Sequence, residues 1–371
     1  MRNPAACRRS HAPCALALAV LLPMVALGAA GCAWTGPGRL NADQTGFTAA
    51  LGDGLKRQML LNMVRLRYAD VPAFVAVSQL ISGYTLQSTG QLGLNAYPNA
   101  AAGNLATVAG TVQYTTRPTF TFTPVTGERF AQSYLRPLAP AELLSLAQSG
   151  APIDVLFRLG VQSVNGLSNG ATRGGDAREA SEGFEALMEA LREVQSAGAV
   201  SLRFERHPAG VGAPGSGRVY LLLDGDDRRA DAAARRVKEL LGSSPDAREL
   251  EVVYGRGRRG PGQVAVLTRS VLQILYELGS QIEVPEADVR RGETPATEAG
   301  AAGLRSRLVV VRQGDRAPDD AYAAVEYRGR WFWIDAGDYR SKAAFAFAHI
   351  LEVLAESGQG QPAPIVTIPA Q

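Results

Sequence analysis

Cysteine and histidine, the residues that most often supply nucleophiles, bases and metal ligands, are scarce in this 371-residue sequence. It contains three cysteines and three histidines. Beyond residue 31, only Cys32, His207 and His349 remain, and no histidine pair stands at metal-ligand spacing. These residues argue against a histidine zinc site, a Ser-His-Asp triad and cysteine chemistry. We therefore predict no catalytic residue, no metal and no cofactor.

One pair of carboxylates could do chemistry. Asp224 and Asp226 follow the apolar run 220–223. This arrangement resembles the aspartate nucleophile motif of phosphatases of the haloacid dehalogenase type, although Arg228 stands where that motif has Thr or Val. The simpler interpretation is that Asp226 caps a helix that begins near residue 227. An Asp-dependent hydrolase using Asp224 and Asp226 is one alternative function.

Gly255, Gly257 and Gly260 match the string G-x-G-x-x-G. A dinucleotide site needs a strand before this string and a helix that opens on it. Here a second strand is predicted at 263–267, so we interpret 255–260 as an arginine-rich hairpin loop. The sequence gives no basic stripe for nucleic acid, and we predict no nucleic-acid partner.

The stretch 331–342 is the most distinctive candidate contact surface. Aromatic residues alternate along a predicted strand, and polar residues then open a predicted helix. One interpretation is a sheet edge packed on that helix, with an N-cap aspartate. The other is a protein-binding site, because Trp, Tyr and Arg are frequent interface anchors. The candidate partner-binding residues are Trp331, Trp333, Asp335, Asp338, Tyr339 and Arg340.

A second candidate surface is a long β-hairpin predicted at about 84–123. Residues of period two occur twice, joined by 97–107, with apolar and Thr/Gln residues alternating. Arg117 is the only charged residue in this region. One interpretation is a half-buried sheet in a soluble domain. The other is an element contributed to an oligomeric envelope assembly or pore, because each strand exceeds the about 9–11 residues that span a membrane.

The N-terminus predicts export and lipid attachment. Residues 1–31 carry three arginines and no acidic residue, which accounts for the whole net charge of +3, and they continue into an apolar run. The run ends in small residues before Cys32 and resembles a bacterial lipoprotein lipobox. That resemblance implies cleavage before Cys32 and acylation of its sulfur and amino group. Ala33 implies the outer membrane, facing the periplasm, and leaves the leaflet open.

Periodicity and turn residues predict the remaining organisation. We expect a signal peptide at 1–31, a tether at 32–46, a helical domain with the hairpin at 47–166, and an α+β domain at 178–371. The predicted fold class is α+β, with N-terminal helices and a mainly antiparallel C-terminal sheet flanked by helices. Helices are expected at 47–68, 178–196, 227–241, 269–280 and 340–356, and two shorter helices are expected to begin near Pro140 and Pro152. Residues 166–177 are a candidate linker. Strands are expected near 200–206, 218–223, 250–254, 263–267, 307–312, 322–328, 331–335 and 364–368.

Four segments together resemble a group of proteobacterial outer-membrane lipoproteins that have no assigned activity: residues 60–86, 114–130, 143–167 and 327–347. The resemblance implies membrane attachment through the N-terminal lipid and adds no catalytic residues. We therefore predict a lipid-anchored envelope protein with a structural or partner-binding role, whose partners are other envelope proteins.

Overall fold

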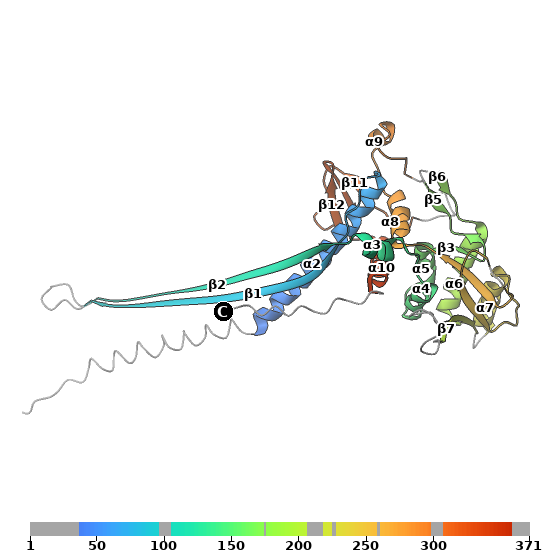
Figure 1. Ribbon diagram of the computed structural model, residues 1–371, viewed down its shortest axis with the longest axis horizontal. Helices are drawn as coiled ribbons and strands as arrows, with labels where there is room; N and C mark the ends of the chain where they lie inside the picture. The colour runs from blue at the N-terminus through green and yellow to red at the C-terminus, as the bar shows by residue number, and fades with distance from the viewer. Residues whose placement is uncertain are drawn as a thin grey trace, which may run out of the picture. The chain divides into compact units, whose positions relative to one another are not determined.

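The structure, a computed structural model, describes residues 37–95, 105–173, 176–205, 218–224, 228–257, 260–297 and 307–357 (Figure 1). Helices combine with mainly antiparallel sheets, so the predicted α+β class is confirmed. The chain forms two compact units, Met1–Met59 and Leu60–Gln371. The predicted signal peptide, Cys32 and the strand predicted at 364–368 lie outside the described residues.

Helix α2 (Pro37–Arg67) begins earlier than predicted, so the second part of the tether expected at 32–46 is helical. Proline is tolerated at this position because the first helical residue needs no N–H donor. Toward its end the helix follows the predicted apolar stripe, and Leu60, Met63 and Val64 have no exposed surface.

Strands β1 (Val75–Asn95) and β2 (Leu105–Pro124) confirm the predicted hairpin and extend it toward residue 75. They run antiparallel from the pair Val75 and Pro124 to the pair Asn95 and Leu105, with one irregularity near Val77. At about 3.3 Å per residue, strands of 21 and 20 residues measure about 65 Å. Figure 1 shows the two strands side by side along their length, and we call this hairpin the ribbon.

Short helices follow the ribbon, as the sequence predicted. They are α3 (Gly127–Phe130), the π-helical turn η2 (Ala131–Leu135), α4 (Pro140–Gln148) and α5 (Ile153–Gly160). Helix α4 has proline in its first turn, and Glu142 accepts a hydrogen bond from the N–H of Ala139. Helix α5 stops at Gly160, and the chain passes directly into a strand.

Within the described residues the main sheet has the strand order β4-β3-β10-β9-β8-β7. Its strands are β3 (Val161–Val164), β4 (Leu167–Ser168), β7 (Val200–Glu205), β8 (Arg218–Leu223), β9 (Glu249–Tyr254) and β10 (Gln263–Thr268). Neighbours are antiparallel except β9 and β10, which are parallel. The hairpin predicted around 255–260 is therefore wrong. A hairpin would join antiparallel strands, whereas β10 runs parallel to β9, with Gln263 opposite Glu251.

The linker proposed at 166–177 does not separate two sheets. Asn165 and Gly166 both have positive φ, and they join β3 to β4 by a two-residue turn. Strand β3 also pairs with β10, so residues on both sides of the predicted boundary share one sheet. Both belong to the compact unit that begins at Leu60. A small hairpin, β5 (Ala171–Arg173) with β6 (Asp176–Arg178), follows.

The main core lies between the sheet and the helices α4, α5 and α6 (Glu182–Ser196). Phe157, Leu187 and Val264, one each from α5, α6 and β10, line the same small interior space. Helix α7 (Arg228–Leu240) packs against α6 and buries its alanine-rich face. Its start confirms the helix predicted at 227–241.

A second sheet has the order β11-β13-β12, from β11 (Arg312–Gly314), β12 (Ala323–Tyr327) and β13 (Arg330–Ile334). The strand predicted at 307–312 is displaced to β11. Residues before it bond elsewhere: the N–H of Val310 donates to Ser341 Oγ, and the carbonyl of Val311 accepts from Glu283 N. The accompanying helices are α8 (Val271–Ser280), α9 (Glu286–Arg290) and α10 (Tyr339–Ser357).

Two buried side chains cap the carboxyl end of α5. The guanidinium of Arg269 donates to the carbonyls of Arg158, Leu159 and Gly170 at 2.8–3.2 Å. The amide of Asn169 also donates to carbonyls of this last turn. Arg269 is 2% exposed, and Glu277 lies 3.9 Å from it. The positive charge therefore sits where the helix dipole favours it.

We expect Arg269→Met to lower the free energy of unfolding by about 3–5 kcal/mol, because it leaves buried carbonyls and Glu277 without the cation. Urea unfolding followed by circular dichroism measures this loss. Arg290→Met, at an exposed arginine of α9, is the matched control and should change stability little. Equal stability of the two variants would contradict the capping role.

Candidate functional site

Three aromatic residues of the 331–342 stretch, Trp331, Phe332 and Trp333, lie in the central strand of the second sheet, and Tyr339 begins helix α10. Phe332 and Ile334 are buried on one face of β13, and Trp331 and Trp333 are half-buried on the other. The indole N–H of Trp333 donates to Asp335 Oδ1 at 2.8 Å. The predicted strand is therefore confirmed, but it is not an edge of its sheet.

The two aspartates of this stretch hold local structure together. Asp335 forms an ion pair with Arg312 of β11. Asp338 accepts hydrogen bonds from Ser341 N at 3.1 Å and Ser341 Oγ at 2.6 Å, which is the predicted N-cap interaction. Burial alone raises the pKa of Asp338, but the bonds from Ser341 lower it overall. Both carboxylates are thus engaged inside the fold.

The outward-facing part of this stretch is small. Tyr339 is 78% exposed, and Arg340 beside it is also exposed. The structure thus brings the six candidate residues together, but it leaves mainly Tyr339 and Arg340 at the surface for a partner. Partner binding by this stretch stays a prediction.

The chemistry-bearing motifs do not form a site within the described residues. Asp224 is exposed at the end of β8, and its N–H donates to the carbonyl of Ala199. Asp226 lies outside the described residues. Gly255 and Gly257 lead toward strand β10 and not toward a helix, so the context of a dinucleotide fingerprint is missing. No group of His, Cys, Asp and Glu among the described residues could hold a metal ion.

The ribbon separates residue types onto two faces. Its register places Thr85 opposite Thr115, Gln87 opposite Gln113, and Thr89 opposite Thr111. Residues opposite one another share a face, and faces alternate along each strand. One face is therefore a ladder of threonine and glutamine, and the described members of it are exposed: Gln87, Thr89, Gln91, Thr111, Gln113 and Thr119.

The other face carries most of the apolar residues. Leu86 lies opposite Tyr114, Leu92 opposite Val108, and Leu94 opposite Ala106. Among the described residues no third strand pairs with β1 or β2. A two-stranded sheet alone is marginally stable in water, and three or more strands or a packing partner are usually needed. The interpretation as part of a larger sheet in one domain thus finds no support in the described residues.

An aromatic cluster closes the base of the ribbon. Phe74 directly precedes β1, and its ring centroid lies 4.0 Å from that of Tyr134 and 5.7 Å from that of Phe130. The N–H of Val125, just after β2, donates to the carbonyl of Phe74. Helix α10 adds Glu352, whose carboxylate accepts the Tyr134 hydroxyl at 2.9 Å. We call these residues the ribbon root.

Helix α10 places three titratable side chains beside the ribbon root: His349, Glu352 and Glu356. His349 Nδ1 lies 3.2 Å from Glu352 Oε2, and the Tyr134 hydroxyl also donates to Glu356. The hydrogen bond with Glu352 raises the pKa of His349 although burial opposes it. Burial and the nearby Glu352 raise the pKa of Glu356. The sequence analysis assigns no role to His349, yet residues 349, 352 and 356 are spaced so that they share one helical face, which is the signal for this group.

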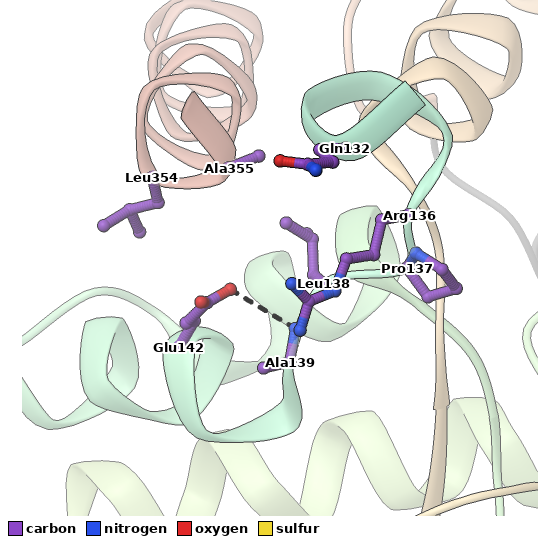
Figure 2. Close-up of a pocket in the computed structure, with 8 residues that line it drawn as sticks. All are labelled: Gln132, Arg136, Pro137, Leu138, Ala139, Glu142, Leu354 and Ala355. Atoms are coloured by element: carbon purple, nitrogen blue, oxygen red, sulfur yellow. Dashed lines mark hydrogen bonds between the residues drawn. The ribbon is translucent and has the colours of Figure 1, made fainter. Parts of the chain in front are cut away.

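A shallow hollow lies beside the root, between η2, α4 and α10 (Figure 2). Gln132, Arg136 and Glu142 supply its polar side chains. Gln132 donates to Glu128, and Glu142 caps Ala139, so two of the three already serve the local fold. Among the residues that line the hollow there is no nucleophile with a neighbouring base. The hollow therefore gives no catalytic constellation.

The pKa shift of His349 predicts a pH dependence of stability. A raised pKa adds stability that is complete below the ordinary value of 6.5 and is lost as the pH rises through the raised value. We expect the free energy of unfolding to fall by up to about 1 kcal/mol between about pH 6 and about pH 9. Urea titrations at both pH values measure it. The fall should be smaller in His349→Gln, and an unchanged fall would contradict this assignment.

Within the described part of the chain, no helix is both long enough and hydrophobic enough to cross a membrane. Comparison with known proteins identified no relative, since no family model, no curated protein and no solved structure matches the chain significantly. The resemblance to proteobacterial lipoproteins accordingly stays a prediction.

Proposed function

We propose that the protein is a lipid-anchored envelope protein without enzymatic activity, whose ribbon binds a protein partner in an envelope assembly. The observation that carries the proposal is the ribbon itself. It is an amphipathic two-stranded sheet of about 65 Å to which the described chain adds no further strand. Cys32 supplies the anchor, and the membrane concerned is the outer membrane on its periplasmic side.

The composition of the ribbon favours a contact with protein. Its two strands carry one charged residue, Arg117, which lies opposite Gly83 in the half nearer the root. Burying this surface therefore removes few charges from water, which is the costly part of forming an interface. Tyr339 and Arg340 are a second, smaller contact surface of the kind found at interfaces.

Cys32→Ala tests the anchor. Without the sulfur neither thioether acylation nor the amino-terminal acyl group can form, and more than one acyl chain is needed for stable attachment. We expect the variant to lose lipid labelling and to leave the membrane fraction. Ser149→Ala, an exposed position in the described chain, is the control. Unchanged membrane attachment and labelling of Cys32→Ala would contradict lipid anchoring.

A shortened ribbon tests the assembly role. Residues 87–113 are replaced by an Asn-Gly turn that joins Leu86 to Tyr114, which lie opposite one another in the sheet. The root stays intact, so the rest of the chain should fold and remain anchored. We expect the native mass of the detergent-extracted protein to fall and its co-purifying proteins to be lost. The same complex with the shortened ribbon would contradict the role of the ribbon.

A membrane pore is a second candidate function for the same element. Residues 84–95 and 105–116 contain no charged residue, and each segment is longer than the about 9–11 residues that cross a bilayer as a strand. Release of a trapped dye from liposomes by the intact protein, and not by the shortened variant, would favour the pore. Retention of the dye by both would remove it.

A further inference from the structure

We propose that the partner of the ribbon is a second copy of this chain, and that β2 of one copy pairs antiparallel with β1 of the next. The inference rests on the proposed function, because it uses the lipid anchor to orient the copies. It adds the identity of the partner, the strands that meet and the direction in which they run.

Each strand of the ribbon has an outer backbone edge that no other described strand borders. In an antiparallel pair, only alternate residues of each strand direct N–H and C=O groups toward the partner strand. Residues 84–95 and 105–116 pair with each other, and no other described strand borders them. Each segment therefore presents a row of backbone donors and acceptors along its outer edge. Such an edge is a template for a further strand.

The outer edges of the ribbon lack the residues that usually prevent a further strand from pairing. Soluble proteins usually guard long edges with charges, prolines or bulges. The ribbon has such features only toward its root: the irregularity near Val77, and Arg117 with Pro118. Residues 84–95 and 105–116 have no charge and no proline. This half of the ribbon is open to edge-to-edge pairing.

A second copy of this chain has strands that match the edges of the ribbon. A strand added to the ribbon must alternate in the same way, because otherwise apolar residues would join the polar face. The strands of another copy have the same alternation of polar and apolar residues and the same length. Their segments 84–95 and 105–116 also carry no charge that would repel the strands of the first copy. Polar positions such as Thr89 and Thr111 would then continue the Thr/Gln ladder, and apolar positions such as Leu86 and Val108 would continue the other face.

The symmetry between two copies determines which strands meet and in which direction their ribbons point. A two-fold axis along the strands would pair β1 with β1 but would turn the second copy over and mix the faces. A two-fold axis perpendicular to the sheet would keep the faces but point the two ribbons in opposite directions. Copies anchored in one membrane through Cys32 lie on the same side of it, and we infer that their ribbons point in the same direction. Only β2 against β1 of the next copy keeps both the faces and the direction, and this contact is head-to-tail.

Disulfide or short bismaleimide cross-linking tests the pairing in the full-length lipoprotein. Beyond Cys32, which the anchor occupies, the sequence after residue 31 has no cysteine. Two differently tagged copies are co-expressed, one with Thr111→Cys or Gln113→Cys on β2. The other carries Gln87→Cys, Thr89→Cys or Gln91→Cys on β1. These positions are exposed on the polar face and cover neighbouring registers.

We expect a cross-linked dimer that contains both tags for at least one combination of a β2 cysteine with a β1 cysteine. Glu286→Cys on α9, at a side chain 93% exposed, measures random collisions. Copies that both carry the β1 cysteine should cross-link only at that background. When both copies also carry Cys32→Ser, we expect the dimer that contains both tags to be lost, because the shared anchor sets the orientation of the copies. This variant is compared in mild detergent at the same protein concentration.

Two results would overturn the inference. Cross-linking of β1 to β1 in preference to β2 would show two-fold pairing, and cross-linking at background for every combination would show that copies do not pair. Neither result touches the proposed function by itself. If a different protein co-purifies with the intact ribbon and is lost from the shortened one, the assembly role stands and the second copy is excluded as the partner.

Discussion

A buried cation at the end of α5 is the constraint on which the folded unit depends. Arg269 follows strand β10, and its guanidinium reaches the carbonyls of Arg158 and Gly170. The neighbouring Thr268 donates its hydroxyl to the carbonyl of Leu138, between η2 and α4. One short segment therefore ties together a helix end, a strand and the helical run behind the ribbon. Separating these elements would leave a buried charge without its partners, which is costly.

The ribbon obeys a different rule. The core of the folded unit is specified by side chains from distant parts of the sequence, such as Phe157 and Val264. The ribbon is specified by neighbours across one hairpin, and the aromatic rings of Phe74 and Tyr134 pack against each other at its base. A helix of the folded unit, α10, supplies the carboxylate that receives the Tyr134 hydroxyl. Glu352 therefore links the base of the ribbon to His349, which lies on the same helix.

Local patterns were sufficient for much of the fold. Period two in 84–123 predicted the ribbon, and proline followed by an apolar run predicted α4 at Pro140. The Asn165-Gly166 turn was not predicted although this dipeptide is a strong hairpin signal, because the glycine-rich run after it has the composition of a linker. The parallel pairing of β9 and β10 was missed for another reason. Strand direction depends on the path of the chain in space, and a period of two does not contain it.

The candidate site divides in the same way. The N-cap role of Asp338 follows from its position before a helix and was an interpretation of the sequence. The contact of Glu352 with Tyr134 joins residues 218 positions apart, so no local pattern reveals it. Which of the aromatic residues in 331–342 would be buried depended on the two strands that flank β13. Those strands, β11 and β12, both precede β13 in the sequence, and their order in the sheet is not contained in the local pattern of 331–342.

The alternation of the ribbon also sets a parity rule for change in its length. Removing one residue from β1 beyond the irregularity would move every residue toward the tip onto the opposite face, because the period is two. Removing two residues from each strand would shorten the ribbon and keep both faces intact. Natural variation in the length of either strand should therefore occur in even steps.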